Sequence, residues 1–394
     1  MHVLFVSHSA DLMGAERSLL ALVGEAVRAR GHQVTVTVPG DGQLRAQLAA
    51  AGADVVVLPT RLWMGRRYGP AVGAVRLLQA LASVPRYRRL LHRTRPDVVV
   101  TNSAVVPAGA IAARMSQVPH VWVVRESLLS NPSLRSVLPR AAIARLIARL
   151  SDGVVAVSAY AAGQVTSAVP MARAKLRVIP PPVESGPDTD APSGPDGVSG
   201  PDGVSGPGAD RPVALERLVL LGRHSAEKGQ ADAVEALAIC ARQGRAFTLT
   251  LAGVGDGEAQ RGLADLARRY GVETQLETVA WTDDPAALYA RADATLMLSR
   301  NEAYGRVTFE SLRSGTPVIG YRAGATTEIL AGGGGLLVDP DAGALASALL
   351  NLAADQEAFG RLAAEASRRG RELATEPSPA ARFVAYLDEL GAVS

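Results

Sequence analysis

Short apolar runs alternate with amphipathic runs along most of the chain. The apolar runs are rich in valine, leucine and isoleucine, which predicts strands buried on both faces. Before residue 184 they lie at 2–7, 33–39, 54–59, 97–103, 120–126, 153–158 and 176–182. After residue 211 they lie at 217–222, 247–253, 274–280, 294–298, 317–321 and 335–338.

The amphipathic runs between these strands predict helices. In residues 15–31, for example, apolar positions recur at spacings of three and four, and the run ends at Gly31. Alternating strands and helices indicate parallel sheets with helices on both faces. We therefore expect an α/β fold with two doubly wound, Rossmann-like domains facing a cleft, residues 1–183 and 212–375. A last helix in 376–394 is expected to pack back toward the first domain.

Residues 184–211 differ from the rest of the chain in composition. They contain the near-repeats SGPDTD, SGPDGV, SGPDGV and SGPGAD, with no aromatic residue. Such a segment has too little apolar surface to offset the entropy of ordering it. We expect a disordered linker between the two domains.

The composition excludes several classes of protein. A chain of 394 residues with 48% hydrophobic and 20% charged residues is typical of a soluble, two-domain protein. The one cysteine, Cys240, lies in a helical pattern and is expected to be buried as a small apolar residue. The first residues predict a strand rather than a signal peptide, and no apolar run approaches the ~18 residues that cross a bilayer. A cytoplasmic location is expected.

Charge is distributed unevenly along the chain. Residues 1–183 carry 22 bases and 8 acids, a net charge of +14, whereas residues 211–394 carry 19 bases and 24 acids, a net charge of −5. A basic domain attracts anionic ligands and surfaces. No nucleic-acid-binding motif accompanies the charge, so nucleic acid is not an expected partner.

The segment 61–95 concentrates this charge, with nine arginines and no acid. Its aromatic residues are Trp63, Tyr68 and Tyr87. Arginines mixed with aromatic and aliphatic residues are typical of an interfacial helix on an anionic membrane. A solvated basic face is the alternative.

Ligands of doubly wound sheets bind in the loops after the strands. In the first such loop of the second domain, Arg223 and Lys228 follow a strand and precede a helix beginning near Gln230. Two cations beside a helix N-terminus suit a diphosphate, and two surface charges without a ligand are the alternative. The chain has 39 arginines but only two lysines, Lys175 and Lys228, which favours a function for Lys228.

The next strand ends in a glycine-rich turn at Gly253, Gly255 and Gly257. The third glycine of a dinucleotide fingerprint would fall at Glu258, so the pattern does not predict an NAD site. We expect a tight strand-to-helix turn in which Gly253 approaches a nucleotide.

The loop after the first strand of the chain reads SHSADLMGAERSLL. Gly14 and Ala15 allow backbone to approach a ligand at a helix N-terminus. Glu16 either complements the helix dipole or accepts hydrogen bonds from that ligand. His8 lies at the strand end and is a further candidate for the cleft.

The two acids of NEAYGRVTFESL, residues 301–312, follow another buried strand. Glu302 falls in the loop, and Glu310 falls about one and a half turns into a helix that ends at Gly315. Gly305 lies at the helix start, where free amides favour an anion. Because a carboxylate accepts two hydroxyl hydrogen bonds, the two acids suit a sugar and a ribose on either side of a phosphate.

Residues 299–330 resemble the E-x7-E signature of family 4 retaining glycosyltransferases, followed by its G-x-P-V-I segment. The segments GAERSLL, GRHSAEKG and GGGGLLVDP match the same family in the expected order. The resemblance covers both domains. It implies a GT-B fold with a nucleotide-sugar donor on the second domain and an acceptor on the first.

The resemblance also implies a role for each matching residue. Arg223 and Lys228 would neutralise the donor diphosphate, Glu302 would contact the donor sugar, and Glu310 would hold the ribose. Backbone near the diphosphate and sugar would come from Tyr304, Gly305, Arg306 and Val307. The donor would be a UDP- or GDP-sugar, used without a metal or a cofactor, and the configuration of the transferred sugar would be retained.

Two features depart from the family pattern. Arg125 and Glu126 end a strand where many members carry a histidine and an acid. Both are expected to face the cleft, with a surface ion pair as the alternative. The usual asparagine-glycine turn before the linker is replaced by PPPVES, which predicts a stiffer start.

The expected function is a hexosyltransferase of cell-envelope polysaccharide biosynthesis, with a saccharide or lipid-linked acceptor at the inner face of the plasma membrane. One alternative is a nucleotide-sugar epimerase or hydrolase of the same fold. Another is a non-catalytic module that binds sugar nucleotides. The presence of Arg223, Lys228, Glu302 and Glu310 together favours an enzyme.

Overall fold

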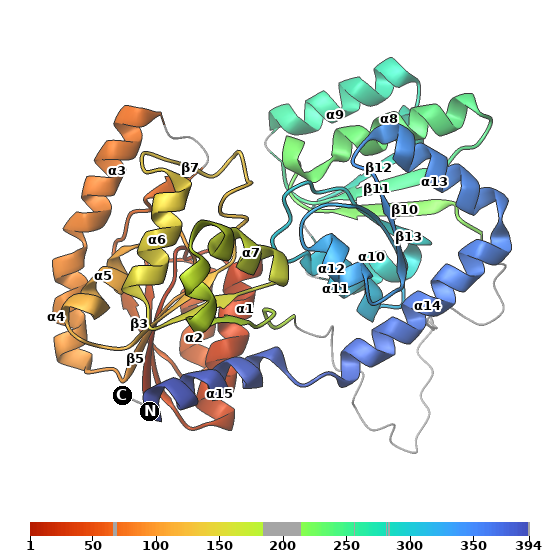
Figure 1. The fold of residues 1–394 in the computed structure, drawn as a ribbon. Helices are drawn as coiled ribbons and strands as arrows, with labels where there is room; N and C mark the ends of the chain where they lie inside the picture. The colour runs from red at the N-terminus through yellow and green to blue at the C-terminus, as the bar shows by residue number, and fades with distance from the viewer. Residues whose placement is uncertain (66–68, 184–213, 256, 281, 283, 393–394) are drawn as a thin grey trace. The chain divides into compact units, whose positions relative to one another are not determined.

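The chain divides into two compact units in the computed structural model, which describes residues 1–65, 69–183, 214–255, 257–280, 282 and 284–392 (Figure 1). Unit 1 contains Met1–Glu184 and Pro377–Ser394, and unit 2 contains Ser185–Glu376. The segment 184–211, expected to be a disordered linker, lies outside the described residues.

Unit 1 is built on a seven-stranded parallel sheet with the order β3-β2-β1-β5-β6-β8-β9. Valine dominates these strands because both faces of the sheet are covered. The strands are β1 (His2–Val6), β2 (Gln33–Val38), β3 (Asp54–Val57), β5 (Val98–Thr101), β6 (His120–Val124), β8 (Gly153–Ala156) and β9 (Leu176–Val178). A separate two-stranded antiparallel sheet consists of β4 (Met64–Gly65) and β7 (Arg135–Ser136).

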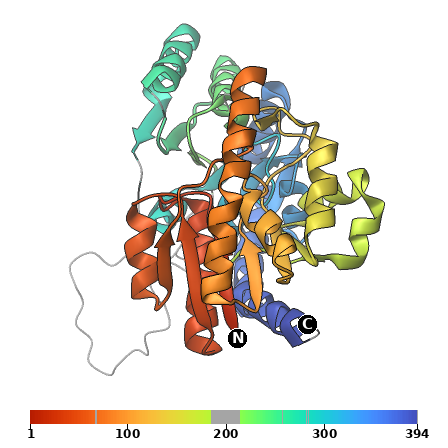
Figure 2. The same ribbon diagram turned by 90° about the vertical axis from the view of Figure 1, so that its left-hand side faces the viewer.

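The helices of unit 1 connect these strands (Figures 1 and 2). They are α1 (Gly14–Gly24), α2 (Gln43–Ala50), α3 (Pro70–Ala82), α4 (Val84–Thr94), α5 (Ala108–Met115), α6 (Arg140–Leu150) and α7 (Ala159–Ala168). The helix predicted over 15–31 is instead α1 followed by a π-helical turn, Glu25–Ala29. An apolar periodicity averaged over several turns does not resolve one wider turn.

The last helix, α15 (Pro379–Ala392), packs against α1 and the π-helical turn within unit 1 (Figure 1). The ring of His32 contributes to this packing, with its Nε2 2.8 Å from Oδ1 of Asp388. Arg30 lies 3.4 Å from the same carboxylate.

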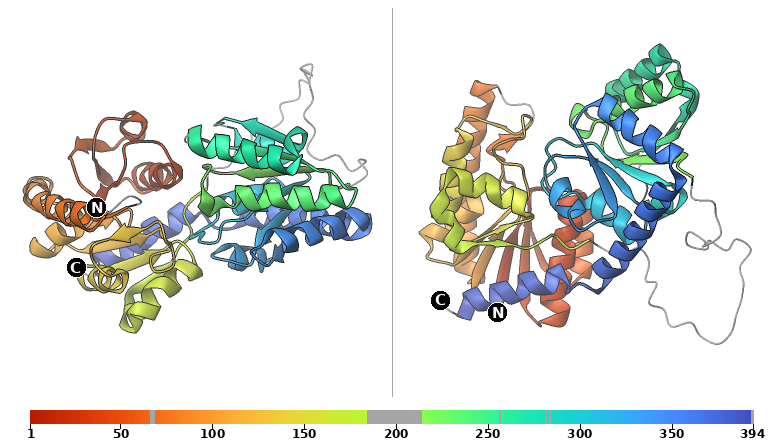
Figure 3. Two further views of the ribbon diagram at one scale, coloured as in Figure 1. Left: turned by 90° about the horizontal axis from the view of Figure 1, so that it is seen from above. Right: turned by 45° about the vertical axis from the view of Figure 1, so that its right-hand side comes forward.

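Unit 2 is built on a six-stranded parallel sheet with the order β12-β11-β10-β13-β14-β15, with helices on both faces (Figure 3). Its strands are β10 (Arg217–Leu221), β11 (Thr248–Ala252), β12 (Leu276–Val279), β13 (Ala294–Met297), β14 (Val318–Tyr321) and β15 (Gly335–Val338). Its helices are α8 (Gln230–Arg242), α9 (Gly257–Tyr270), α10 (Pro285–Arg291), α11 (Arg306–Arg313), α12 (Thr326–Leu330), α13 (Ala342–Ala354) and α14 (Gln356–Thr375). The predicted class, α/β with two doubly wound Rossmann-like sheets, is confirmed.

Both sheets reverse their strand order at a single point. In unit 1 the first strand, β1, lies between β2 and β5, and in unit 2 the first strand, β10, lies between β11 and β13. The loops after the two central strands diverge there, and this leaves room for a ligand outside their carboxyl ends. The switch points therefore locate the places to search.

Two aromatic residues of the segment 61–95 lie inside unit 1, so the interfacial-helix interpretation, one of two left open, does not hold for them. Trp63 stacks on Trp122 with ring centroids 6.1 Å apart, and its Nε1 donates to the carbonyl of Ala104 at 2.8 Å. The hydroxyl of Tyr87 is 2.9 Å from Oγ1 of Thr60. Large aromatic rings are more stable buried in a core than exposed at a surface. Tyr68 is not among the described residues.

Cys240 is buried in the core of unit 2, as predicted. It lies on α8, among leucines from β10, β11 and β13. No helix in the described part of the chain combines the length and apolar character needed to cross a bilayer.

Candidate functional site

Lys228 and Glu302 form an ion pair at the switch point of unit 2. The Nζ atom of Lys228 donates to Oε2 of Glu302 at 2.7 Å, although 74 residues separate the two in the sequence. Lys228 ends the loop after β10, and Glu302 lies in the loop after β13. An ammonium group has three donors, so this pair leaves Lys228 able to contact a further anion.

Close backbone approaches bring the two loops together. Gly229 has a φ of +74°, and a Cβ there would lie 2.7 Å from the carbonyl oxygen of Leu298. On the other side of the β13 loop, the N–H of Ala325 donates to the carbonyl of Glu302 at 2.9 Å. Gly324, with a φ of +57°, would place a Cβ 2.9 Å from the backbone nitrogen of Glu302. Glycine is therefore required at both positions to seat the β13 loop.

The Glu302 carboxylate is ionised by its contacts. Burial alone would raise its pKa, but the ion pair with Lys228 and hydrogen bonds from the backbone N–H groups of Gly305 and Tyr304 together lower it. The Gly305 N–H donates to Oε1 at 3.2 Å. This amide was expected to face an anion, but it donates to Glu302 instead. Amides for a bound anion would then come from the first turn of α11.

Glu310 is held by two neighbours on the other side of α11. The hydroxyl of Tyr289, on α10, donates to Oε2 at 2.9 Å. Arg306, one turn earlier on α11, donates from Nη2 to Oε1 at 3.0 Å. Burial and the adjacent carboxylate raise the pKa of Tyr289, so its hydroxyl remains a donor. Glu302 thus lies in the loop after β13 and Glu310 in α11, as the sequence predicted.

The other residues predicted for the donor lie around this pair. The ring of Tyr304 is buried beside Phe309, with centroids 6.0 Å apart. Val307 lies in the first turn of α11, and the Arg223 side chain is exposed after β10. Gly253 has a φ of +145°, and a Cβ there would lie 2.8 Å from the carbonyl carbon of Gly222. Gly253 is therefore needed for close contact between the loops after β10 and β11.

Sequence reasoning missed two residues of this region. Tyr289 lies in a helical run whose contact with Glu310 depends on how α10 and α11 pack. His224 lies in the loop after β10, only 5% exposed, and neither ring nitrogen has a hydrogen-bond partner among the described residues. Burial lowers its pKa, so the imidazole is neutral. Its position within the motif GRHSAEKG was the available signal, but burial cannot be read from that motif.

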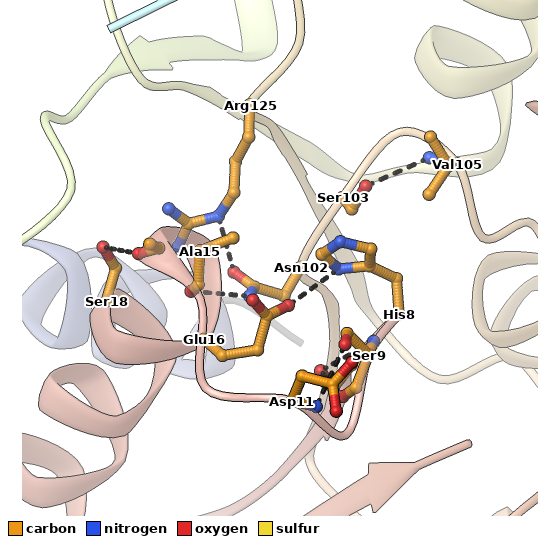
Figure 4. A network of polar contacts seen from close by, with 12 residues as sticks. His8, Ser9, Asp11, Ala15, Glu16, Ser18, Asn102, Ser103, Val105 and Arg125 are labelled. Carbon is orange, nitrogen blue, oxygen red and sulfur yellow. Dashed lines mark hydrogen bonds and ion pairs between the residues drawn. The ribbon is translucent and has the colours of Figure 1, made fainter. Parts of the chain in front are cut away.

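A second polar cluster lies at the switch point of unit 1 (Figure 4). His8 follows β1, and its Nδ1 is 3.2 Å from Oε1 of Glu16 in the first turn of α1. Asn102, after β5, donates to the carbonyl of Ala15 at 3.5 Å and accepts from Nε of Arg125 at 2.9 Å. The cluster joins the loops after three adjacent strands, β1, β5 and β6.

Arg125 and Glu126 attach to the β5 loop rather than forming a simple surface pair. The Glu126 carboxylate accepts from the hydroxyl of Ser103 and from the backbone N–H of Ala104, the latter at 3.1 Å. It also accepts from the backbone N–H of Arg125 at 2.9 Å. The carboxylate therefore fixes the turn in which the Arg125 side chain reaches Asn102. The remaining predicted residue, Gly14, begins α1, and its carbonyl accepts from Oγ of Ser18 at 3.0 Å.

Glu16 titrates near neutrality. Its side chain is 1% exposed, and burial raises its pKa to about 7 against the opposing influence of its own backbone contacts and Arg125. Burial also lowers the pKa of His8; the charge of Glu126 opposes this effect and the charge of Arg125 adds to it. Burial therefore disfavours the charged form of both groups in the His8–Glu16 contact.

We expect the stability of the protein to reflect this titration. A carboxyl group with a folded pKa above its unfolded value stabilises the fold fully below the unfolded pKa, and this stabilisation is lost as pH rises through the folded pKa. As the pH rises from 5 to 8, the free energy of unfolding of the original chain should therefore fall by about 2 kcal/mol relative to that of Glu16→Gln. Denaturant titrations across this range measure the difference. Asp11→Asn is the comparison for loss of an exposed acid in the same loop, and a Glu16→Gln difference independent of pH would contradict the assignment.

Comparisons with known proteins find a glycosyltransferase family that is similar to each unit. Residues 13–186 match the family described as Glycosyltransferase Family 4, and residues 211–372 match Glycosyl transferases group 1. Together these ranges include every residue predicted for the site except His8.

Individual relatives are more distant. The chain is 30% identical to the glycogen synthase of Mycobacterium tuberculosis over 285 residues, which cover 70% of this chain and 64% of that protein. It is 34% identical to the lipopolysaccharide core biosynthesis glycosyltransferase LpsE of Rhizobium meliloti over 166 residues, 42% of this chain and 45% of LpsE. The chain thus spans less than two thirds of the length of these curated relatives.

The fold matches solved glycosyltransferase structures over nearly the whole chain. HepE of Anabaena, in a crystal structure with UDP and glucose, aligns with 98% of this chain and 99% of its own, at 20% identity and a TM-score of 0.72. The predicted GT-B fold is confirmed. The chain is therefore similar to Glycosyltransferase Family 4 over residues 13–186 and to Glycosyl transferases group 1 over residues 211–372, on a GT-B fold.

Proposed function

We propose that this protein is a retaining, metal-independent glycosyltransferase that moves a hexose from a UDP- or GDP-sugar to a saccharide or lipid-linked acceptor. The observation that carries the proposal is the Lys228–Glu302 pair at the switch point of unit 2. A cation and a carboxylate, 2.7 Å apart in the loops where such sheets bind ligands, match the two ends of a sugar diphosphate.

The donor site consists of four parts. Lys228 and Arg223 bind the diphosphate, with amides from the first turn of α11. Glu302 accepts hydrogen bonds from the sugar, and Glu310 accepts them from the ribose through the lone pairs that Tyr289 and Arg306 leave open. His224 adds a neutral, buried imidazole in the same loop as Lys228.

The acceptor site is proposed at the cluster of unit 1. The His8–Glu16 contact and the Arg125 side chain offer a proton acceptor and a cation beside the backbone of Gly14 and Ala15. The +14 net charge of residues 1–183 favours an anionic acceptor, such as a saccharide on a lipid diphosphate. Synthesis of a cell-envelope polysaccharide and a location at the inner face of the plasma membrane belong to the same proposal.

Transfer proceeds on one face of the sugar. The bond between the anomeric carbon and the diphosphate oxygen breaks, the acceptor oxygen bonds to that carbon from the same side, and the departing phosphate oxygen takes the acceptor proton. Charge develops on the leaving diphosphate, so cations and amides placed in advance at that position lower the barrier. Lys228 and the start of α11 supply this stabilisation, which is why no metal is required.

The test is product formation from a panel of UDP- and GDP-sugars with a membrane lipid extract as the acceptor source. We expect one donor to give a new glycosylated product with the anomeric configuration of the donor, determined by NMR, and an unchanged rate in EDTA. Inversion, or loss of activity in EDTA that a divalent metal restores, would overturn the retaining or metal-independent part.

The same assay separates the two alternatives. Release or epimerisation of the sugar without any acceptor would identify a hydrolase or an epimerase. Nucleotide-sugar binding without turnover of any donor, across acceptor fractions, would identify a binding module.

A further inference from the structure

Helix α3 presents an aliphatic face to solvent. Four of its side chains, Val72, Val75, Leu78 and Leu81, are 48%, 52%, 67% and 42% exposed. At a spacing of three residues they extend over successive turns on one half of the helix. A surface helix normally carries charged residues on this half, because apolar side chains are stabilised by burial.

The opposite half of α3 is already packed against unit 1. Gly73 and Ala80 are buried, and Leu77 packs against the main core of the unit. A Cβ at Gly73 would lie 3.4 Å from the Cβ of Val137, which follows β7 and is itself 40% exposed. The exposed aliphatic residues are therefore a second apolar face, separate from the half that packs against unit 1.

Exposed arginines lie on the elements next to α3. Arg61 precedes β4, and Arg135 begins β7, which is followed by the residue that contacts α3, Val137. Along α4, which follows α3 down one side of unit 1 in Figure 1, the exposed arginines are Arg86, Arg89 and Arg93. Residues 55–96 contain no aspartate or glutamate, so no acidic side chain of this segment offsets the charge.

The aliphatic face and the arginines together favour one kind of binding partner, an anionic bilayer. An aliphatic helix face bordered by arginines matches a bilayer with anionic headgroups, where apolar side chains enter the acyl boundary and guanidinium groups contact phosphates. A second copy of the chain would bring two segments of nine arginines together, which charge repulsion opposes. A protein partner would favour exposed aromatic anchors, and the described aromatic residues of this segment, Trp63 and Tyr87, are buried.

We propose that the exposed face of α3 docks onto an anionic lipid bilayer, with Val72, Val75, Leu78 and Leu81 inserted and the neighbouring arginines on lipid phosphates. The role of this surface rests on the proposed function, because docking would bring unit 1 to lipid-linked acceptors. Lipid binding itself is measured without any donor or acceptor.

The experiment is flotation of the full chain with vesicles of phosphatidylcholine alone or with added phosphatidylglycerol. We expect binding to the anionic vesicles that weakens as salt is raised, and little binding to phosphatidylcholine alone. Leu78→Glu should weaken binding by about tenfold or more, because it places a charge in the inserted face. Met171→Glu is the matched control, since Met171 is 88% exposed elsewhere in unit 1 and the charge change is equal.

A double variant tests the contribution of charge alone. Arg86→Gln with Arg89→Gln should weaken binding to anionic vesicles by about tenfold or more at low salt. The proposal is overturned if Leu78→Glu binds as tightly as Met171→Glu, or if binding ignores the anionic lipid. It is also overturned if the original chain self-associates without lipid and Leu78→Glu makes it monomeric, because a second copy then covers the face.

Failure here is distinct from failure of the proposed function. A chain that ignores vesicles but transfers sugar to an acceptor in detergent would retain its activity and lose only this surface. A chain that binds vesicles through α3 without turnover of any donor would show the reverse.

Discussion

Lys228→Met lowers sugar transfer by about a hundredfold to a thousandfold, the effect expected for removing one preorganised charge from a developing anion. The loss has two causes. The leaving diphosphate loses a cation, and Glu302 loses the partner that lies 2.7 Å away and helps to lower its pKa. The kcat of transfer, measured with the donor found in the panel, tests this.

Glu302→Gln is expected to lose a similar factor, because the amide keeps the shape of the side chain but not its charge. Since the two residues form one unit, the double variant should lose much less than the product of the two single losses. Lys175→Met is the matched control: it removes the chain's other lysine, which donates to the carbonyl of Ser151 in unit 1 at 2.6 Å. Full activity in both Lys228→Met and Glu302→Gln would contradict the site.

Gly324→Ala is expected to have the second largest effect, because it displaces the loop that carries Glu302. The new Cβ would lie 2.9 Å from the Glu302 nitrogen and closer still to its carbonyl oxygen, so the backbone must move. The shift also breaks the hydrogen bond from Ala325 to that carbonyl. We expect nucleotide-sugar affinity to fall by about tenfold or more, as the Lys228–Glu302 geometry is lost.

The control for Gly324→Ala separates steric displacement from backbone strain. Gly244→Ala carries the same kind of strain, with a φ of +80°, but nothing lies within 4 Å of its Cβ. Both variants pay roughly 1–2 kcal/mol for a left-handed alanine. Denaturant unfolding and nucleotide titration of both variants are compared. Equal losses of affinity would mean that Gly324 has no special contact with the site.

The sequence pattern predicted the fold class and the placement of the donor residues on loops and helices. The apolar run at 294–298, the loop after it and the helix from 306 appear as β13, a loop and α11. Gly315 ends that helix with a φ of +74°, as expected for a glycine after a helix. Local patterns suffice here because each element's boundaries depend on its own residues.

Contacts between distant segments could not be predicted in the same way. The Lys228–Glu302 pair depends on β10 lying beside β13, and the Tyr289 contact to Glu310 depends on how two helices pack. The role of Glu16 was left open between the helix dipole and a ligand, and its burial beside His8 cannot be read from the motif. Candidate residues could be chosen by residue type, whereas their pairing required the strand order.

Burial of the basic segment shows the same limit. Arginines and aromatic residues together left a membrane face and a solvated basic face open. Trp63 and Tyr87 instead fill the core, and the exposed apolar residues include valines and leucines of α3. Composition identified the segment. Only the packing of Gly73 and Ala80 determines which half of the helix faces outward.

The central claim, that a sugar diphosphate binds at Lys228, is tested most directly by amine footprinting, because the chain has only two lysines. The protein is treated with an amine-reactive ester with and without a nucleotide sugar that raises its melting temperature, and both lysines are quantified by mass spectrometry. We predict that the nucleotide sugar slows modification of Lys228 several-fold and leaves Lys175 unchanged, and that the nucleoside without phosphates protects neither. Modification of Lys228 at an undiminished rate, with the nucleotide sugar bound, would contradict the account.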